Sequence, residues 1–169
     1  MTATSTSPDA GASRHAMAVT LPSDCEVAVT RTFDAPRRLV WAANTVPAHL
    51  QRWLLGPDGW TMPVCEVDLR VGGAWRYEWA KPGETGFGFG GEYLEVVPEE
   101  RLVYTESPAA GMPPAVVTMR LDEVDGRTVL TQTMRFADRA SRDAAIRTGM
   151  NDGVAASYDR LDGVLAAIA

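Results

Sequence analysis

The sequence predicts an α+β fold of the helix-grip type, in which a strongly curved antiparallel sheet wraps around one long C-terminal helix. Between Trp60 and Phe136, strand-like runs of about 6 to 11 residues are separated by turn signals, as in an antiparallel meander. One strand and two short helices precede this region, and a helical period follows it. A sheet of this length curls, and only the last helix is long enough to fill its hollow side. We therefore expect a ligand cavity between them.

The first 22 residues are rich in Ser, Thr, Ala, Gly and Pro and have no sustained period. Residues 1–22 are therefore expected to form a disordered N-terminal tail. Residues 23–169 are expected to form a single helix-grip domain, because a chain of 169 residues buries one good core.

Residues 26–33 alternate in character and are rich in β-branched side chains, which predicts the first strand. Asp34 and Pro36 then indicate a helix start, with the aspartate at the cap and the proline in the first turn. Residues 44–47 restart a second short helix, which the glycines and proline of residues 56–59 end.

Residues 86–91, Gly-Phe-Gly-Phe-Gly-Gly, match the GxGxxG pattern of dinucleotide-binding loops. That fingerprint requires a helix that opens at the last glycine, whereas residues 92–97 continue as a strand. We therefore expect these glycines to permit a strong bend or a bulge in the sheet, and we expect no nucleotide cofactor.

The end of the chain has apolar residues at steps of three or four, which predicts one long helix capped by Asp138 or Ser141. Gly149 and Gly153 lie inside this pattern, and each costs about 1 kcal/mol relative to alanine. Either a close approach of the helix to the sheet or space left for a ligand would explain them.

Aromatic and methionine side chains supply the candidate walls of the cavity. In a fold of this kind a solid core and a cavity wall are built from the same surface, so both interpretations stay open. The hydroxyl groups of Tyr104 and Tyr158 could orient a polar group of a ligand. The candidates are Trp53, Trp75, Tyr77, Trp79, Phe89, Tyr93, Tyr104, Met119, Met134, Met150 and Tyr158.

Two polar side chains are candidates for chemistry in the cavity, although no catalytic residue can be assigned. His49 is the only histidine of the predicted domain and could act as a base or a polar anchor, or simply lie exposed on its helix. Glu66 shares a strand face with Asp68, which suits either a buried acid–base pair or a solvated face. Glu92 and Glu106 raise the same question.

Composition excludes several functional classes. A net charge of −6 argues against a nucleic-acid footprint, which needs a basic face. Two distant cysteines and two histidines do not make a zinc site, so we expect no metal and two reduced thiols. No apolar run approaches the ~20 residues of a membrane helix and no secretory signal opens the chain. We therefore expect a cytoplasmic protein, and a homodimer is left open.

Several motifs, in order, resemble the START-like (SRPBCC) superfamily, and most closely its branch related to the C-terminal domain of the heat-shock chaperone ATPase activator. The resemblance extends over residues 26–168 and implies the helix-grip (START-like, Bet v-like) fold. Members bind lipids, sterols, polyketides or hormones, and some catalyse cyclisation or dehydration. The motifs are Arg31–Pro36, Val40–Trp41, Pro47–Trp53 with Gly56–Pro57, Asp68–Tyr77, Glu95–Thr105 and Gly149–Leu161.

Three functions remain as hypotheses. The first is binding of a small hydrophobic or aromatic molecule in the cavity. The second is a polyketide cyclase/dehydratase-like enzyme, with His49 or Glu66 as base and Tyr104 or Tyr158 as proton donor. The third is a protein-interaction module such as a chaperone cofactor. Activation of a chaperone ATPase is not expected, since the additional N-terminal domain of the eukaryotic co-chaperone is not recognisable in the sequence.

Overall fold

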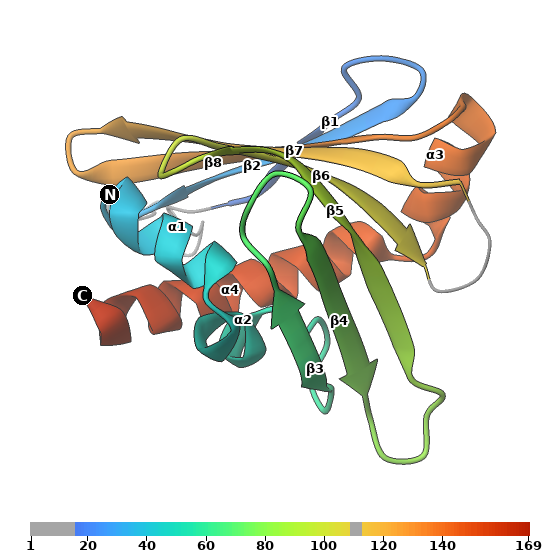
Figure 1. Ribbon diagram of the computed structural model, residues 1–169, viewed down its shortest axis with the longest axis horizontal. Helices are drawn as coiled ribbons and strands as arrows, with labels where there is room; N and C mark the ends of the chain where they lie inside the picture. Colours follow the sequence, from blue (N-terminus) through green and yellow to red (C-terminus); the bar gives the residue numbers. More distant parts are fainter. Residues whose placement is uncertain (1–15, 109–112) are drawn as a thin grey trace, which may run out of the picture.

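The computed structural model describes residues 16–108 and 113–169, and these form a curved antiparallel sheet that encloses one long helix (Figure 1). The sheet has eight strands in the order β1-β2-β8-β7-β6-β5-β4-β3. The predicted fold class is confirmed. The elements are β1 (Ala18–Thr20), β2 (Glu26–Phe33), α1 (Arg37–Thr45), α2 (Pro47–Trp53), β3 (Thr61–Val67), β4 (Ala74–Ala80), β5 (Phe87–Val97), β6 (Arg101–Pro108), β7 (Ala115–Val124), β8 (Arg127–Arg135), α3 (Arg139–Arg147) and α4 (Met150–Ile168).

The core lies between the concave face of the sheet and the helices α1, α2 and α4 (Figure 1). Strand alternation sends every second side chain of β2 inward, so Val29 and Phe33 join the core. From α4, Tyr158, Leu161 and Leu165 meet them, at the steps of three and four that the sequence shows. The amphipathic period of α4 therefore fixes which stripe of the helix faces the sheet.

A buried arginine also attaches α4 to the sheet. Arg31 of β2 is only 4 % exposed, and its guanidinium donates to Asp159 at 2.7 Å and to Asp162 at 2.6 Å. Its position between Val29 and Phe33 in the alternation places a charge on the inner face, where only ionic partners make it tolerable.

The glycine-rich run lies in β5, as expected, and no helix opens at its end. A Cβ at Gly91 would lie 1.8 Å from the carbonyl oxygen of Thr105, so no other residue fits there without moving the backbone. The pairing of β5 with β6 shifts register between Tyr93 and Glu95. These glycines therefore accompany a bend in the sheet and do not form a dinucleotide loop.

Two expected boundaries were wrong. Ala18–Thr20 pairs with β2 as the edge strand β1, so the predicted tail extends too far; residues 1–15 lie outside the described residues. The predicted C-terminal helix is two helices, because Gly149 adopts a left-handed φ of 82° between α3 and α4.

The helix caps were predicted with mixed success. Asp138 caps α3, with its side chain accepting from the Ser141 amide at 2.7 Å. Asp34 does not cap α1. The N-cap is Pro36, which has no side-chain cap bond, and Asp34 pairs with Arg127 at 3.1 Å. A buried hydroxyl nearby stabilises the entry to α1, since Thr128 donates to the Ala35 carbonyl oxygen at 2.7 Å.

Candidate functional site

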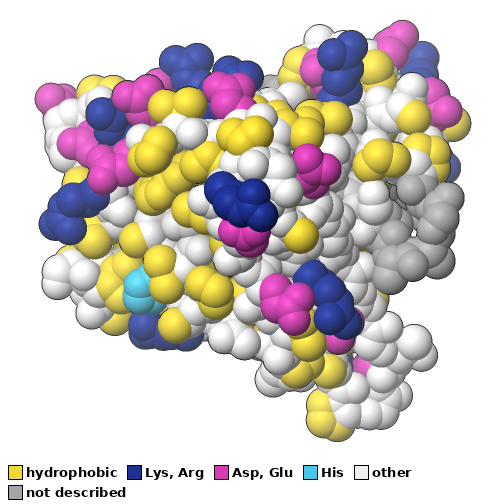
Figure 2. Space-filling view, in the orientation of Figure 1, with side chains coloured by type: hydrophobic (Ala, Val, Ile, Leu, Met, Phe, Trp, Pro, Cys, Tyr) yellow, Lys and Arg dark blue, Asp and Glu magenta, His cyan; other side chains and the backbone are white. Residues whose placement is uncertain are grey.

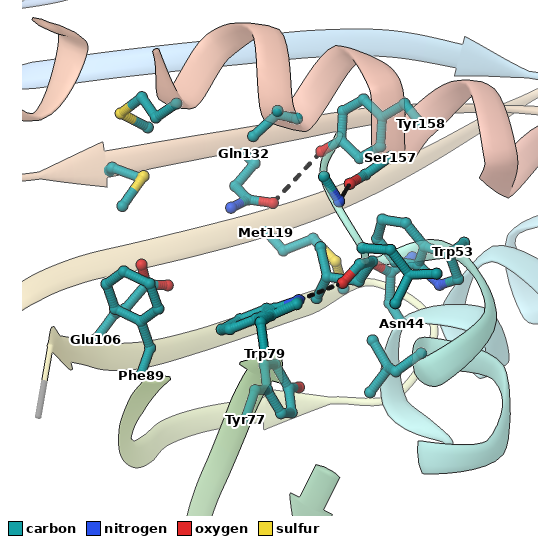
Figure 3. A pocket seen from close by; sticks show the side chains of 18 of the residues that line it. Asn44, Trp53, Tyr77, Trp79, Phe89, Glu106, Met119, Gln132, Ser157 and Tyr158 are labelled. Carbon is teal, nitrogen blue, oxygen red and sulfur yellow. Dashed lines mark hydrogen bonds between the residues drawn. The ribbon is translucent and has the colours of Figure 1, made fainter. Parts of the chain in front are cut away.

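A partly open cavity of about 650 Å³ lies between the sheet and the helices α2 and α4 (Figure 3). Its lining comes from strands β4 to β8, from α2 and the loop after it, and from the first half of α4. The volume falls in the range of sites for drug-sized ligands. The core is therefore not filled by side chains on this side of α4.

All eleven aromatic and methionine candidates line this cavity. The alternation of β4 directs Trp75, Tyr77 and Trp79 to the same side, and the helical period brings Met150 and Tyr158 to the facing stripe of α4. The full set is Trp53, Trp75, Tyr77, Trp79, Phe89, Tyr93, Tyr104, Met119, Met134, Met150 and Tyr158.

Three of the four tryptophans that line the cavity have indole N–H groups bonded to backbone carbonyls; the fourth is Trp60. Each of these three indole rings is therefore held in place, and what it offers to the cavity is apolar surface and a π face. Figure 3 shows the Trp79 bond at the side of the cavity near Trp53. The three bonds run from Trp53 to Ala43 (2.9 Å), from Trp75 to Thr105 (3.0 Å) and from Trp79 to Leu54 (2.7 Å).

The loop that follows α2 forms one rim of the cavity and is attached to α4. The Gly56 amide donates to the Ser157 hydroxyl at 2.9 Å, and Arg160 donates to the Gly56 carbonyl oxygen. Arg160 also pairs with Asp58 at 2.7 Å. These contacts join two segments about a hundred residues apart and fix the position of the rim.

The tyrosines of the cavity are neutral at physiological pH, and burial raises the pKa of each phenol further above its ordinary value of 10.0. The pKa of Tyr93 rises to about 12, and those of Tyr77, Tyr104 and Tyr158 rise further above their ordinary value. The Tyr158 hydroxyl donates to the side-chain oxygen of Gln132 at 3.4 Å, a long hydrogen bond (Figure 3). As neutral groups, these hydroxyls can donate or accept hydrogen bonds toward a ligand.

Glu106 is the one charged side chain among the described residues that line the cavity. It follows Tyr104 by two positions on β6, so both point inward. Burial raises the pKa of its carboxyl group to about 7, and its negative charge contributes, after burial, to the raised pKa of Tyr104. Figure 3 places Glu106 beside Phe89, at the end of the cavity away from Trp53.

The two polar candidates from the sequence lie elsewhere. His49 is half-buried on α2 and Glu66 is exposed on β3, and neither lines the cavity. Glu66 lies 3.9 Å from Arg76, on the outer face of the sheet. Their positions do not support a role as base toward a ligand in the cavity.

Four polar wall residues were missed by sequence reasoning: Asn44, Gln132, Thr148 and Ser157. Ser157 belongs to the same helical stripe as Met150 and Tyr158. Gln132 shares a strand face with Leu130 and Met134, so the helical and strand periods already place both polar residues on the inner side. A polar residue on a predicted apolar stripe therefore indicates a polar position in the wall of the cavity.

Gly153 of α4 lines the cavity, and a Cβ added there would meet no atom within 4 Å. Of the two explanations expected for this glycine, these open surroundings exclude a close approach of the helix to the sheet. The glycine instead leaves space on the side of α4 that faces the cavity.

Within residues 16–108 and 113–169, no group of three or more His, Cys, Asp or Glu side chains is placed to hold a metal ion. Cys25 and Cys65 are free thiols. Figure 2 shows Lys and Arg interspersed with Asp and Glu on the face that it displays. No helix among the described residues is both long and apolar enough to cross a membrane.

The model of the family described as "Activator of Hsp90 ATPase homolog 1-like protein" matches residues 34–166. The chain belongs to this family. The resemblance to the START-like superfamily is thereby confirmed. The match covers every element from α1 to α4 except the last two residues of α4. No curated protein matches the chain.

Several solved structures share the fold of this member of the family. A protein from Rhodobacter sphaeroides is 30 % identical, with a TM-score of 0.83, over 91 % of this chain and 100 % of that one. A protein from Nitrosomonas europaea is 26 % identical, with a TM-score of 0.77, over 86 % and 97 %. The AHSA1-like protein from Aeromonas hydrophila is 21 % identical, with a TM-score of 0.69 over 82 % and 92 %, and supports the fold alone.

Proposed function

We propose that this protein binds a small hydrophobic or aromatic molecule in the cavity between the sheet and α4. The observation that supports this most directly is the cavity of about 650 Å³ itself, whose wall includes the eleven predicted aromatic and methionine side chains together with Trp60 and Phe87. Unfilled apolar space lowers stability, because the lining atoms lose contacts that a packed core would give them. A ligand would restore those contacts.

Two further features support binding. The indole N–H groups of Trp53, Trp75 and Trp79 are bonded to backbone, so a ligand without polar groups leaves none of these three unpaired. Gly153 keeps the facing side of α4 open at a cost to the helix of about 1 kcal/mol. Membership of the activator-homologue family fits this function, since START-like proteins often bind hydrophobic ligands.

The experiment is a titration with N-phenyl-1-naphthylamine, an uncharged aromatic probe that fluoresces in apolar surroundings. We expect saturable binding to the unmodified protein. Gly153→Trp, which places an indole in the cavity, should weaken binding at least tenfold. Gly163→Trp on the exposed side of the same helix is the matched control and should bind as the unmodified protein does.

Equal affinity in the two variants would place the probe outside the cavity and contradict the proposal. Circular dichroism and thermal unfolding check that both variants are folded. Native mass spectrometry of protein purified from its own host, followed by extraction, then identifies what the cavity carries.

A second candidate function, acid–base catalysis of the cyclase/dehydratase kind, is favoured by one observation. A carboxyl group with a raised pKa lies near the Tyr104 hydroxyl inside the cavity, and such groups are common at active sites. The base would be Glu106, and not His49 or Glu66. Conversion of an extracted ligand by the protein, lost in Glu106→Gln, would distinguish turnover from binding.

A chaperone-cofactor role has less support. Large apolar side chains are exposed just after β1, in the β3–β4 turn and on β5, at positions such as Leu21, Val71 and Leu94. Nothing in their arrangement indicates a particular partner. Binding in the cavity therefore remains the function that the geometry supports best.

A further inference from the structure

The end of the cavity near Glu106 combines one carboxyl group with aromatic walls. Glu106 and Phe89 lie on neighbouring strands, and Phe89 pairs with Pro108, two positions along β6 from Glu106. Residues related in this way share a face of the sheet as diagonal neighbours. Tyr104, two positions before Glu106 on β6, completes this end.

No cation balances Glu106 within the described part of the chain. None of the arginines, the lysine or the histidine described there forms an ion pair with it, and none of them lines the cavity. Glu106 lines the cavity and is half-buried, and this burial withdraws its carboxyl group in part from bulk water. An ionised carboxylate in such a place is costly unless a positive charge comes to it.

The aromatic rings beside Glu106 favour a cation as well. Phe89 makes an edge contact with Trp79 at 5.8 Å between centroids, and Tyr104 makes one with Trp75 at 5.4 Å. Rings held in this way present π faces and edges at fixed angles, and a π face attracts an ammonium group. A carboxylate next to such rings is the arrangement that recognises an organic cation.

The same end of the cavity disfavours an anionic ligand. A fatty acid or an aromatic acid would bring a second carboxylate close to Glu106, with no described lysine or arginine in the lining to offset the repulsion. The apolar remainder of the wall disfavours a small polar cation without a hydrophobic body. What fits both requirements is an aromatic or hydrophobic group that carries one basic alkyl amine.

We propose that the cavity selects small arylalkyl amines, whose ammonium group pairs with the Glu106 carboxylate beside Phe89 and Tyr104 while the aromatic body contacts the tryptophans. This inference rests on the proposed function, because it names the ligand class of the same cavity. The desolvation of Glu106 is already part of the folded protein, so the ligand adds only the desolvation of its own ammonium group.

The test compares three ligands of one size in displacement of N-phenyl-1-naphthylamine at about pH 8, where the carboxyl group is ionised. They are 2-(1-naphthyl)ethylamine, 2-(1-naphthyl)ethanol and 1-naphthylacetic acid, which carry an ammonium, a hydroxyl and a carboxylate group. We expect the amine to bind at least tenfold more tightly than the alcohol, and the alcohol more tightly than the acid.

In Glu106→Gln, the amine and the alcohol should bind within threefold of each other, each displacement being referred to the affinity of the probe for that variant. Glu92→Gln removes an exposed carboxylate of β5 outside the cavity and should keep the full preference for the amine. The isosteric glutamine keeps the volume of the wall, so a loss of preference reports the charge alone.

The outcomes separate the two proposals. Binding of the neutral probe with equal affinity for amine and alcohol in the unmodified protein would overturn the amine inference and leave the hydrophobic cavity site intact. A preference for the amine that survives Glu106→Gln would also overturn it. Absence of binding by the probe and by all three ligands would overturn the proposed function, and the amine inference with it.

Discussion

The guanidinium of Arg31 on β2 lies 2.7 Å from a carboxylate oxygen of Asp159 on α4, across 128 positions of sequence. The arginine is 4 % exposed whereas the aspartate is 72 % exposed, so the two partners of this ion pair lie in different surroundings. Asp162 adds a second bond at 2.6 Å, and the Nε atom of Arg31 has no partner among the described residues. In this ion pair, therefore, the positive charge of Arg31 is buried while the negative charge of Asp159 is exposed to solvent.

This asymmetry predicts unequal effects of removing either partner. Asp159→Asn combined with Asp162→Asn leaves the buried charge of Arg31 unbalanced, and should cost about 3 kcal/mol in the free energy of unfolding. Arg31→Met leaves two aspartates that water can solvate and fills the same space, and should cost less than about 1 kcal/mol. Urea unfolding of both variants measures the difference; equal losses would contradict this account.

The carboxyl group of Glu106 makes stability depend on pH. Its pKa in the folded protein, about 7, lies above the ordinary value of 4.5, so the folded state holds a proton that the unfolded state has lost. Its contribution is fully present below pH 4.5 and is lost as the pH rises through about 7. The neighbouring phenols of Tyr77, Tyr93 and Tyr104 have raised pKa values and do not titrate in this range.

Glu106→Gln should therefore be more stable than the unmodified protein at about pH 8, by about 2 kcal/mol, and nearly equal to it at about pH 5. Thermal unfolding at several pH values measures this crossover, with Glu92→Gln as the control on the outer face. A constant difference between the two proteins over this range would show that Glu106 is not desolvated.

The two glycines of the C-terminal helical region should respond oppositely to alanine. Gly149 has a φ of 82°, which strains any residue with a Cβ, so Gly149→Ala should lose about 1 kcal/mol. Gly153 is helical with open space around its Cβ position, so Gly153→Ala should gain up to about 1 kcal/mol. Denaturant unfolding compares them directly, and a change of the same sign in both would exclude the helix break at Gly149.

Cys65 should be an unreactive thiol. Burial raises its pKa to about 11, and the thiolate is the reactive form, so alkylation by iodoacetamide at about pH 8 should be at least about a hundredfold slower than that of a free thiol. Peptide mapping after timed labelling gives the rate at this site. Labelling in urea is the control, since unfolding should remove the protection; rapid labelling of the folded protein would show that the thiol is solvated.

The walls of the cavity were predictable because two periods converge on them. The alternation of Trp75, Tyr77 and Trp79 marks one strand face, and the spacing of Met150 and Tyr158 marks one helix stripe. Local patterns of this kind need no knowledge of which segments meet.

The features that were missed depend on pairing between distant segments. The edge strand Ala18–Thr20 is only three residues long and exists through its register with β2. Alternation places Cys65 and Glu66 on opposite faces of β3 but does not show which of them points inward. The irregular pairing of β3 between Thr61 and Val64 weakens the pattern further. The inward orientation of Glu106, in contrast, could be predicted from the sequence, because Glu106 shares a strand face with Tyr104.

The indole N–H bonds to Ala43, Thr105 and Leu54 have an evolutionary consequence. They orient the walls without reference to any ligand, whereas the only charge in the described lining resides at position 106. For the ligand binding proposed above, shape and charge preference would thus be encoded by different residues, and a substitution at position 106 alone would change the class of ligand. Relatives with the same walls and a different residue at this position would then be expected to have diverged in what they carry while conserving how they fold.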